Sequence, residues 1–132
     1  MYTGTMNLRA RFYLALATSI IVISIHYIAY TLYLYWTFKQ TDIFVHALGG
    51  LMSGLYVLVA LRFIRYPETL FNVIVGTLVI GIGWEVLELG YRVADLTPYY
   101  WLNMVQDLVC DCIGGVLAFY IWKKLPEPKL QN

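Results

Sequence analysis

The stretch from Trp101 to Trp122, WLNMVQDLVCDCIGGVLAFYIW, decides the fold, because it is apolar enough to span a lipid bilayer and still contains two aspartates. A carboxylate near the centre of a membrane helix costs about 2.5–3.5 kcal/mol even on the mildest insertion scale. Asp107 and Asp111 lie one helical turn apart, so they share one face of the helix with Asn103. This face requires a partner, a proton or a metal ion, and the other segments must supply it.

The composition of the chain is that of a membrane protein. Hydrophobic residues make up 61% of the 132 residues, and charged residues only 13%. Four segments are long enough to cross a hydrocarbon layer of about 30 Å, at residues 12–36, 44–64, 70–90 and 101–122. Short connections favour antiparallel neighbours. We therefore expect an all-α protein with one integral membrane domain over residues 1–132, a four-helix transmembrane bundle of antiparallel up-down topology.

The basic residues are distributed unequally between the two ends of these segments. One side of the membrane would carry only Lys39 and Arg92, whereas the other would carry seven basic residues: Arg9, Arg11, Arg62, Arg65, Lys123, Lys124 and Lys129. Because basic residues accumulate on the cytoplasmic side, this asymmetry predicts a multi-pass protein of the cell membrane with both termini cytoplasmic, N-in and C-in. No run of basic residues suits a phosphate backbone, so we do not expect nucleic acid as a partner.

Small residues also follow a pattern within the segments. Gly50 and Gly54 are spaced as in the G-x-x-x-G motif, which lets membrane helices approach closely. The motif predicts packing inside the bundle, and a contact between the copies of a homo-oligomer is the alternative.

The polar residues inside the segments gather on a few helix faces. Asp42 and His46 share a face of the second segment, whereas Asp107 and Asp111 share a face of the fourth. The third segment presents Glu85, Glu88 and Arg92 on one face, and the first carries His26 at a similar depth. In the expected topology all five carboxylates lie in the outer half of the membrane. We predict that these residues form one ligand-binding pocket: His26, Asp42, His46, Glu85, Glu88, Arg92, Asp107 and Asp111.

The charge of this group cannot persist in a low dielectric. Five ionised carboxylates and one arginine would leave a net charge of −4, so either several carboxyls are protonated or divalent cations lie between them. An oxygen-rich set with one imidazole suits Mg²⁺, Mn²⁺ or Ca²⁺ better than Zn²⁺. The predicted metal ligands are His46, Glu85, Glu88, Asp107 and Asp111. A purely structural role is the alternative, with Asp42 solvated near the interface and His26 serving as a packing residue.

The same residues resemble a known family. The order D-x-x-x-H from Asp42, E-x-x-E from Glu85 and D-x-x-x-D-x-x-G from Asp107, over about residues 41–118, is similar to the VanZ-like family of small multi-pass membrane proteins. The resemblance implies a compact multi-helix protein, associated in its named member with resistance to a glycopeptide that binds cell-wall precursor outside the membrane. The family tends toward Gln at the position of Glu88 and toward Asn at that of Asp111. This chain therefore adds negative charge at both positions.

Three functions fit these observations: ligand binding, transport, and a non-catalytic structural role. The favoured one is an outward-facing acidic pocket that binds a divalent cation and a polar, phosphate-bearing lipid or cell-envelope precursor headgroup, so that membrane lipid or a lipid-linked substrate would be the partner. Passage of protons or cations through the acidic cluster is the second, and a non-catalytic membrane interaction subunit is the third. The residues match no known signature of a membrane phosphatase or CDP-alcohol transferase, so the sequence leaves enzymatic activity open.

Overall fold

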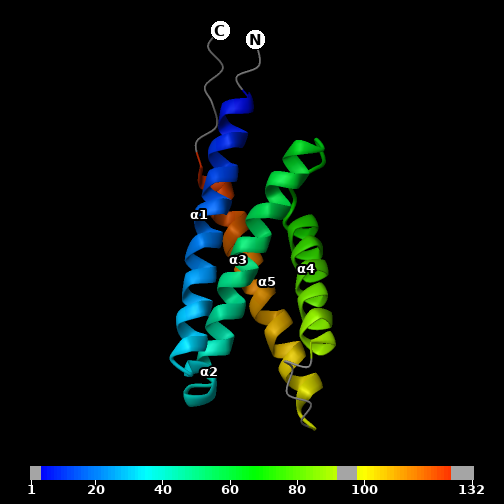
Figure 1. Ribbon diagram of the computed structural model, residues 1–132. Helices are drawn as coiled ribbons and strands as arrows, with labels where there is room; N and C mark the ends of the chain where they lie inside the picture. Colours follow the sequence, from blue (N-terminus) through cyan, green and yellow to red (C-terminus); the bar gives the residue numbers. More distant parts are fainter. Residues whose placement is uncertain (1–3, 92–97, 126–132) are drawn as a thin grey trace.

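The computed structural model describes residues 4–91 and 98–125, with side chains from residue 8 onward. This part of the chain is helical, without strands. Four long helices form a bundle, and one short helix joins the first two (Figure 1). Their bounds are α1 Gly4–Thr31, α2 Leu34–Thr37, α3 Gln40–Phe63, α4 Leu70–Gly90 and α5 Tyr100–Lys124. The predicted all-α bundle of four long apolar helices is confirmed.

The four long helices are all long and apolar enough to cross a membrane. In the most apolar stretch of each, only 22–33% of the residues are buried inside the bundle. Large apolar side chains such as Ile23, Phe71 and Val86 point outward, whereas Arg11, Asp107 and other polar residues lie inside. A soluble protein has the opposite distribution. This distribution supports a multi-pass membrane protein whose outer surface faces lipid.

The first predicted segment, residues 12–36, is wrong at its C-terminal end. Helix α1 ends at Thr31, and α2 follows after Tyr33, whose backbone has a left-handed conformation with φ 57°. The amides of Trp36 and Thr37 then both donate to the carbonyl of Tyr33. A run of aromatic and apolar residues continues through this break, so hydropathy gives no sign of it. The second long helix, α3, begins at Gln40 and not at residue 44 as predicted. Asp42 therefore lies in its first turn.

Helices α3 and α5 cross at the centre of the bundle, with α1 and α4 on either side of them (Figure 1). Gly50 of α3 lies directly against the backbone of Asp111, and a β-carbon at Gly50 would overlap that backbone. The backbone of α3 at Ala47 and Leu51 contacts Gly114 in the same way. Only glycine permits so close an approach of two helices.

The Gly50 and Gly54 motif packs inside the bundle. Both residues are buried, and a β-carbon at Gly54 would lie 3.0 Å from Cα of Gly115 and 2.8 Å from Cβ of Ala118. The internal-packing interpretation of the motif is therefore the one that the structure bears out. Gly50 contacts Asp111, and Gly54, one turn later, contacts Gly115 and Ala118, so the two helices run in the same direction. The beginning of α3 therefore lies beside the beginning of α5.

The opposite end of the bundle contains a buried arginine, Arg11, for which the sequence indicates only a contribution to the topology. Arg11 is 1% exposed; its guanidinium lies 4.3 Å from the ring centroid of Trp122 and donates to the carbonyls of Trp122 and Leu125 at 3.2 and 3.4 Å. These carbonyls lie at the end of α5, where the last turn lacks i+4 amide donors, and that of Trp122 also accepts from the amide of Leu125 at 3.3 Å. Arg11 therefore connects the beginning of α1 to the end of α5.

Two further charged residues complete this end of the bundle. Glu68 accepts hydrogen bonds from Arg62 and from the indole of Trp122, each at 2.5 Å. The buried arginine, the tryptophan and this ion pair thus connect α1, α3, α5 and the segment between α3 and α4. The tryptophan also belongs to the adjoining apolar cluster, which consists of Ala15, Leu55, Leu58, Val73, Ala118 and Trp122.

The crossing of α3 and α5 gives a direct stability test. We expect Gly114→Ala to destabilise the protein by about 1–3 kcal/mol, because the added methyl group overlaps the backbone of α3. Gly83→Ala is the matched control, since no atom lies within 4 Å of a β-carbon there and alanine favours a helix over glycine by about 1 kcal/mol. The measurement is unfolding in detergent. Equal stability of the two variants would contradict the close crossing.

Candidate functional site

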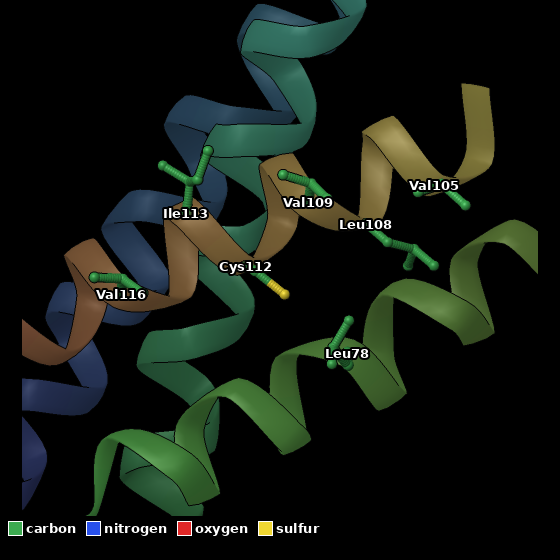
Figure 2. Close-up of a pocket in the computed structure, with 7 residues that line it drawn as sticks. All are labelled: Leu78, Val105, Leu108, Val109, Cys112, Ile113 and Val116. Atoms are coloured by element: carbon green, nitrogen blue, oxygen red, sulfur yellow. The ribbon is translucent and has the colours of Figure 1, made fainter. Parts of the chain in front are cut away.

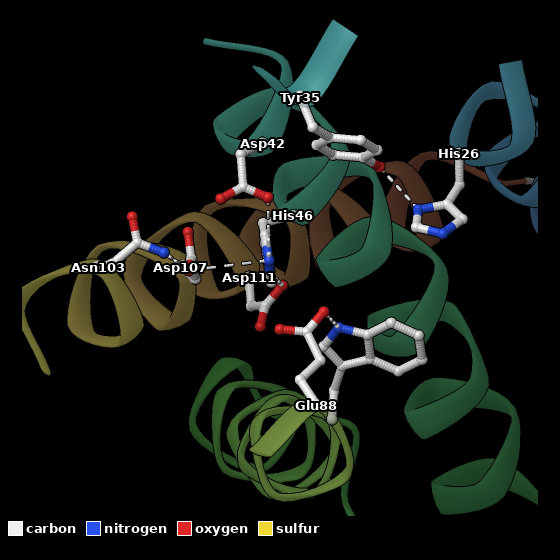
Figure 3. A network of polar contacts seen from close by, with 9 residues as sticks. His26, Tyr35, Asp42, His46, Glu88, Asn103, Asp107 and Asp111 are labelled. Carbon is white, nitrogen blue, oxygen red and sulfur yellow. Dashed lines mark hydrogen bonds and ion pairs between the residues drawn. The ribbon is translucent and has the colours of Figure 1, made fainter. Parts of the chain in front are cut away.

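The parallel contact between α3 and α5 brings the acidic faces of the two helices together. Asp42 and His46 precede Gly50 by two turns and one turn, and Asp107 precedes Asp111 by one turn. Because Gly50 lies against Asp111, these four side chains meet at the end of the bundle where both helices begin. Figure 3 shows them converging from the two helices.

His46 lies at the centre of the cluster and contacts three carboxylates. Its Nε2 atom is 3.7 Å from Oδ1 of Asp42 and 3.9 Å from Oδ2 of Asp107. On the other side of the ring, Nδ1 is 3.4 Å from Oδ1 of Asp111 (Figure 3). One donor atom each from Asp42, His46 and Asp107 lie within 4.8 Å of one another, which is close enough to hold a single metal ion.

Asp107 is the most buried of these carboxylates, with 2% of its surface exposed. Its Oδ2 accepts a hydrogen bond of 2.8 Å from the amide of Asn103, one turn earlier on α5. Its Oδ1 is buried and has no hydrogen-bond partner. An unpaired buried polar atom costs about 1–3 kcal/mol, and more if it is charged. Such an atom at the centre of a cluster indicates a missing ligand or proton.

Helix α4 contributes Glu85 to the same region. Glu85 is 4% exposed, and its Oε1 is also buried without a hydrogen-bond partner. The charges of Glu88, Asp107 and Asp111 all act on it. Glu88 itself is only partly buried, and its carboxylate accepts a hydrogen bond of 2.8 Å from the indole of Trp84 on the same helix. Glu85 is therefore part of the buried cluster, and Glu88 lies at its edge.

The carboxylate of Asp111 occupies a space between two glycines. A β-carbon at Gly49 of α3 would lie 3.9 Å from Oδ1, and one at Gly81 of α4 would lie 2.5 Å from Oδ2. The glycine at position 81 thus creates room for the carboxylate between α4 and α5. Glu85 lies one turn further along the same face of α4.

His26 lies apart from the carboxylates and pairs with Tyr35 of α2. The ring is exposed, and its Nδ1 is 2.7 Å from the Tyr35 hydroxyl (Figure 3). Burial, followed by the charges of Asp42 and Glu88, raises the pKa of Tyr35 to about 12. The phenol therefore keeps its proton at neutral pH and can donate it to a neutral imidazole.

The structure thus brings most of the predicted site residues together. Contacts with His46 join three of them, namely Asp42, Asp107 and Asp111. Glu85 is buried nearby, where the charges of Asp107 and Asp111 act on it. His26, in contrast, contacts Tyr35. Arg92 lies outside the described residues. The geometric triad contains Asp42, which the predicted metal set did not include. The helical spacing of Asn103 to Asp107 and of Trp84 to Glu88 could have revealed both supporting hydrogen bonds from the sequence.

Two apolar grooves lie away from this cluster. The one in Figure 2, of about 310 Å³, lies between α4 and α5 and is lined by Leu78, Val105, Leu108, Val109, Cys112, Ile113 and Val116. The other, of about 390 Å³, lies between α1, α2 and α3. The lining of the first is apolar, and the lining of the second is mostly apolar but includes Gln40 and Thr41.

No protein-family model, curated protein or solved structure matches the chain. The fold and the site together define a class, namely a multi-pass membrane protein with carboxylates and a histidine gathered at one end of the bundle.

The space for Asp111 can be tested by a double-mutant cycle. Gly81→Ala should destabilise the parent by about 1–3 kcal/mol, because the methyl group meets the Asp111 carboxylate. In an Asp111→Ala background the same change should be neutral or stabilising by up to about 1 kcal/mol. The free energy of unfolding in detergent measures both values. Gly83→Ala should have the same effect in both backgrounds. An unchanged cost of Gly81→Ala would show that the side chain of Leu108, whose Cδ2 lies 3.1 Å from such a β-carbon, limits the space instead of the carboxylate.

Proposed function

We propose that the protein binds a divalent cation between Asp42, His46 and Asp107. The observation that supports this most directly is the convergence of three donor atoms, from two helices, within 4.8 Å of one another. The unpaired, buried Oδ1 of Asp107 adds a reason for a cation to be favourable here. Three protein ligands would leave positions open for water or for an oxygen of a ligand.

The types of donor atom narrow the choice of metal ion. Two carboxylates favour Mg²⁺, Ca²⁺ or Mn²⁺, and the imidazole favours a transition metal, so Mn²⁺ satisfies both preferences best. Structural Zn²⁺ would prefer more sulfur and nitrogen ligands. Asp111 supports His46 as a ligand, because a carboxylate facing Nδ1 favours the proton on that nitrogen and leaves Nε2 free for the metal.

We place this cation near the outer face of the membrane. The proposal has the four long helices crossing alternately, with both termini cytoplasmic, because seven of the nine basic residues then lie inside. Arg11 connects the beginning of α1 to the end of α5, which is consistent with both ends lying on one side. The carboxylate cluster lies toward the other end of α5.

The ligand that fits this position is a polar lipid headgroup that bears a phosphate, such as a cell-envelope precursor. A cation with open coordination positions attracts phosphate oxygens, and a site near the membrane surface is within reach of headgroups. The resemblance to the VanZ-like family agrees with this class of ligand. We propose that the site binds the cation and the headgroup, and we propose no reaction.

Passage of protons or cations through the bundle is less well supported. Beyond Asp111 the interior contains the apolar cluster of Leu55, Leu58, Val73 and Ala118. The buried hydroxyl groups of Ser53 and Thr77 lie between the two regions: the first donates to a backbone carbonyl, and the second has no hydrogen-bond partner. They do not form a continuous chain of hydrogen bonds. The arrangement therefore fits a pocket open at one end better than a path.

The cation proposal predicts metal-dependent stability. Mn²⁺ at about 100 times its dissociation constant should stabilise the folded protein by about 2.7 kcal/mol through mass action. The gain should increase as pH rises and fade in acid, because the imidazole binds metal only when neutral and the carboxylates only when ionised. Thermal unfolding in detergent with Mn²⁺, Mg²⁺, Ca²⁺ or a chelator, across pH, measures the effect.

Two variants separate the cation from general packing. Asp111→Asn should weaken metal binding by about 10- to 100-fold, since it removes the charge that orients His46, and should make the metal-free protein more stable. Ser53→Ala, a buried change outside the cluster, should leave the metal response as in the parent. If no divalent cation shifts the unfolding of the parent, the carboxylates are protonated structural groups and the proposal is wrong.

The membrane orientation has its own test. In a background with Cys110 and Cys112 replaced by alanine, a cysteine at Thr41 should react with a membrane-impermeant thiol reagent only from outside the cell. A cysteine at Lys124, at the other end of the bundle, should react only after the membrane is opened. Labelling of Thr41→Cys only from the cytoplasmic side would reverse the topology.

A further inference from the structure

Positive charge is concentrated at the end of the bundle opposite the carboxylate cluster. Six of the seven basic residues in the described part of the chain lie there: Arg9, Arg11, Arg62, Arg65, Lys123 and Lys124. Glu68 is the one acid among the described residues at this end, and it is paired with Arg62. This end therefore has a net positive charge, most of it on exposed side chains.

Four of these basic residues are exposed on the outside of the bundle, and we call them the basic rim. They are Arg9 near the beginning of α1, Arg65 directly after α3, and Lys123 and Lys124 at the end of α5. Arg9 lies about 200° around α1 from the buried Arg11, and Lys124 lies about 200° around α5 from the buried Trp122. These side chains therefore point away from the bundle, into the layer that surrounds it.

Exposed apolar side chains lie directly beside the basic rim. Phe63 and Ile64, which immediately precede Arg65, are both exposed. On α5 the Nζ atom of Lys123 lies 5.4 Å from the ring centroid of Phe119, one turn back toward the middle of the helix. Long basic side chains extend in this way along apolar surface where it meets a charged layer. The basic rim thus lies where lipid chains give way to headgroups.

Arg65 occupies a backbone position that glycine would adopt more easily. Its backbone is left-handed, with φ 58°. The amides of Arg65 and Tyr66 donate to the carbonyls of Arg62 and Leu61 at 3.2 and 2.8 Å, and these bonds close the end of α3. Glycine is the most common residue directly after such a helix end, because a side chain is strained there. The presence of an arginine despite this strain favours a role for its charge.

We propose that the basic rim binds the headgroups of anionic phospholipids, so that lipids such as phosphatidylglycerol gather around this end of the bundle. The charges are complementary, and the exposed apolar side chains beside the rim would contact the acyl chains of the same lipids. Each basic residue near an anionic membrane surface raises the affinity about fivefold. Because the four side chains come from three helix ends, they suit several lipids around the bundle better than one ligand in a pocket. The rim shares no residue with the cation site and lies at the other end of the bundle.

The test uses spin-labelled lipids in phosphatidylcholine vesicles that contain the purified protein. Electron spin resonance measures the fraction of spin-labelled phosphatidylglycerol, and separately of spin-labelled phosphatidylcholine, that the protein immobilises. We expect the parent to prefer phosphatidylglycerol at low salt and to lose this preference at about 1 M salt, where the screening length is about 3 Å. Lys123→Gln combined with Lys124→Gln should lower the preference at least about twofold. Lys39→Gln is the matched control, because it removes an exposed charge from the other end of the bundle.

Two further variants separate the charge of the rim from its contribution to the fold. Arg65→Gly should lower the preference for phosphatidylglycerol and at the same time raise the unfolding temperature in detergent, because glycine adopts the left-handed conformation without strain. Lys123→Arg combined with Lys124→Arg keeps both charges and should keep the preference of the parent. Size-exclusion chromatography verifies that each variant is folded.

Three results would overturn the lipid-binding rim. Equal immobilisation of the two lipids by the parent would leave these basic residues as determinants of topology alone. A parent-like preference in the folded double glutamine variant would show that other groups select the lipid. An equal loss of preference in Lys39→Gln would show that the selection does not belong to this end of the bundle. Removal of divalent cations with a chelator should leave the preference unchanged, because the rim contains no carboxylate.

Discussion

The backbone contact between α3 and α5 is the constraint on which the rest of the structure depends. Gly50 and Gly114 allow the two helices to touch without intervening side chains, and no other residue type would fit at either position. The same contact fixes the axial register, which brings Asp42 and His46 beside Asp107. A shift of one turn along α5 would leave only one of Asp107 and Asp111 beside the histidine. Helix packing and the polar cluster are therefore determined by the same few residues.

The bundle is stabilised differently at its two ends. At one end the positive charge of Arg11 is satisfied by the carbonyls of α5 and by the ring of Trp122, and Arg62 is paired with Glu68. At the other end the acids outnumber their partners, and two buried oxygens have none. Charge that is fully compensated indicates a structural role. Charge that is left uncompensated inside a membrane protein is costly, so these acids require either protons or a bound ligand.

The proposed chemistry follows from this imbalance. The proposed cation between α3 and α5 would neutralise part of the cluster and connect the two helices where both begin. It would lie beside Asp107, the most buried acid of the cluster, which has an unpaired oxygen. Metal binding and the packing of α3 against α5 would then be coupled. A ligand that completes the coordination would stabilise the same arrangement of helices.

The sequence by itself determined the all-helical fold, the four apolar helices and the polar faces, because hydropathy and the helical period act over neighbouring residues. It also indicated the acids that would be buried, since Asp107, Asp111 and Glu85 stand in stretches that only lipid or protein can surround. It could not locate the break at Tyr33, where one residue in a left-handed conformation interrupts an otherwise continuous apolar run. The tertiary structure alone decided which donor atoms meet between helices, and it placed His46 against Asp107 and Asp111 while it held His26 against Tyr35. That choice depends on the register and distance between helices, which the contacts of Gly50 and Gly114 set and which no local pattern encodes.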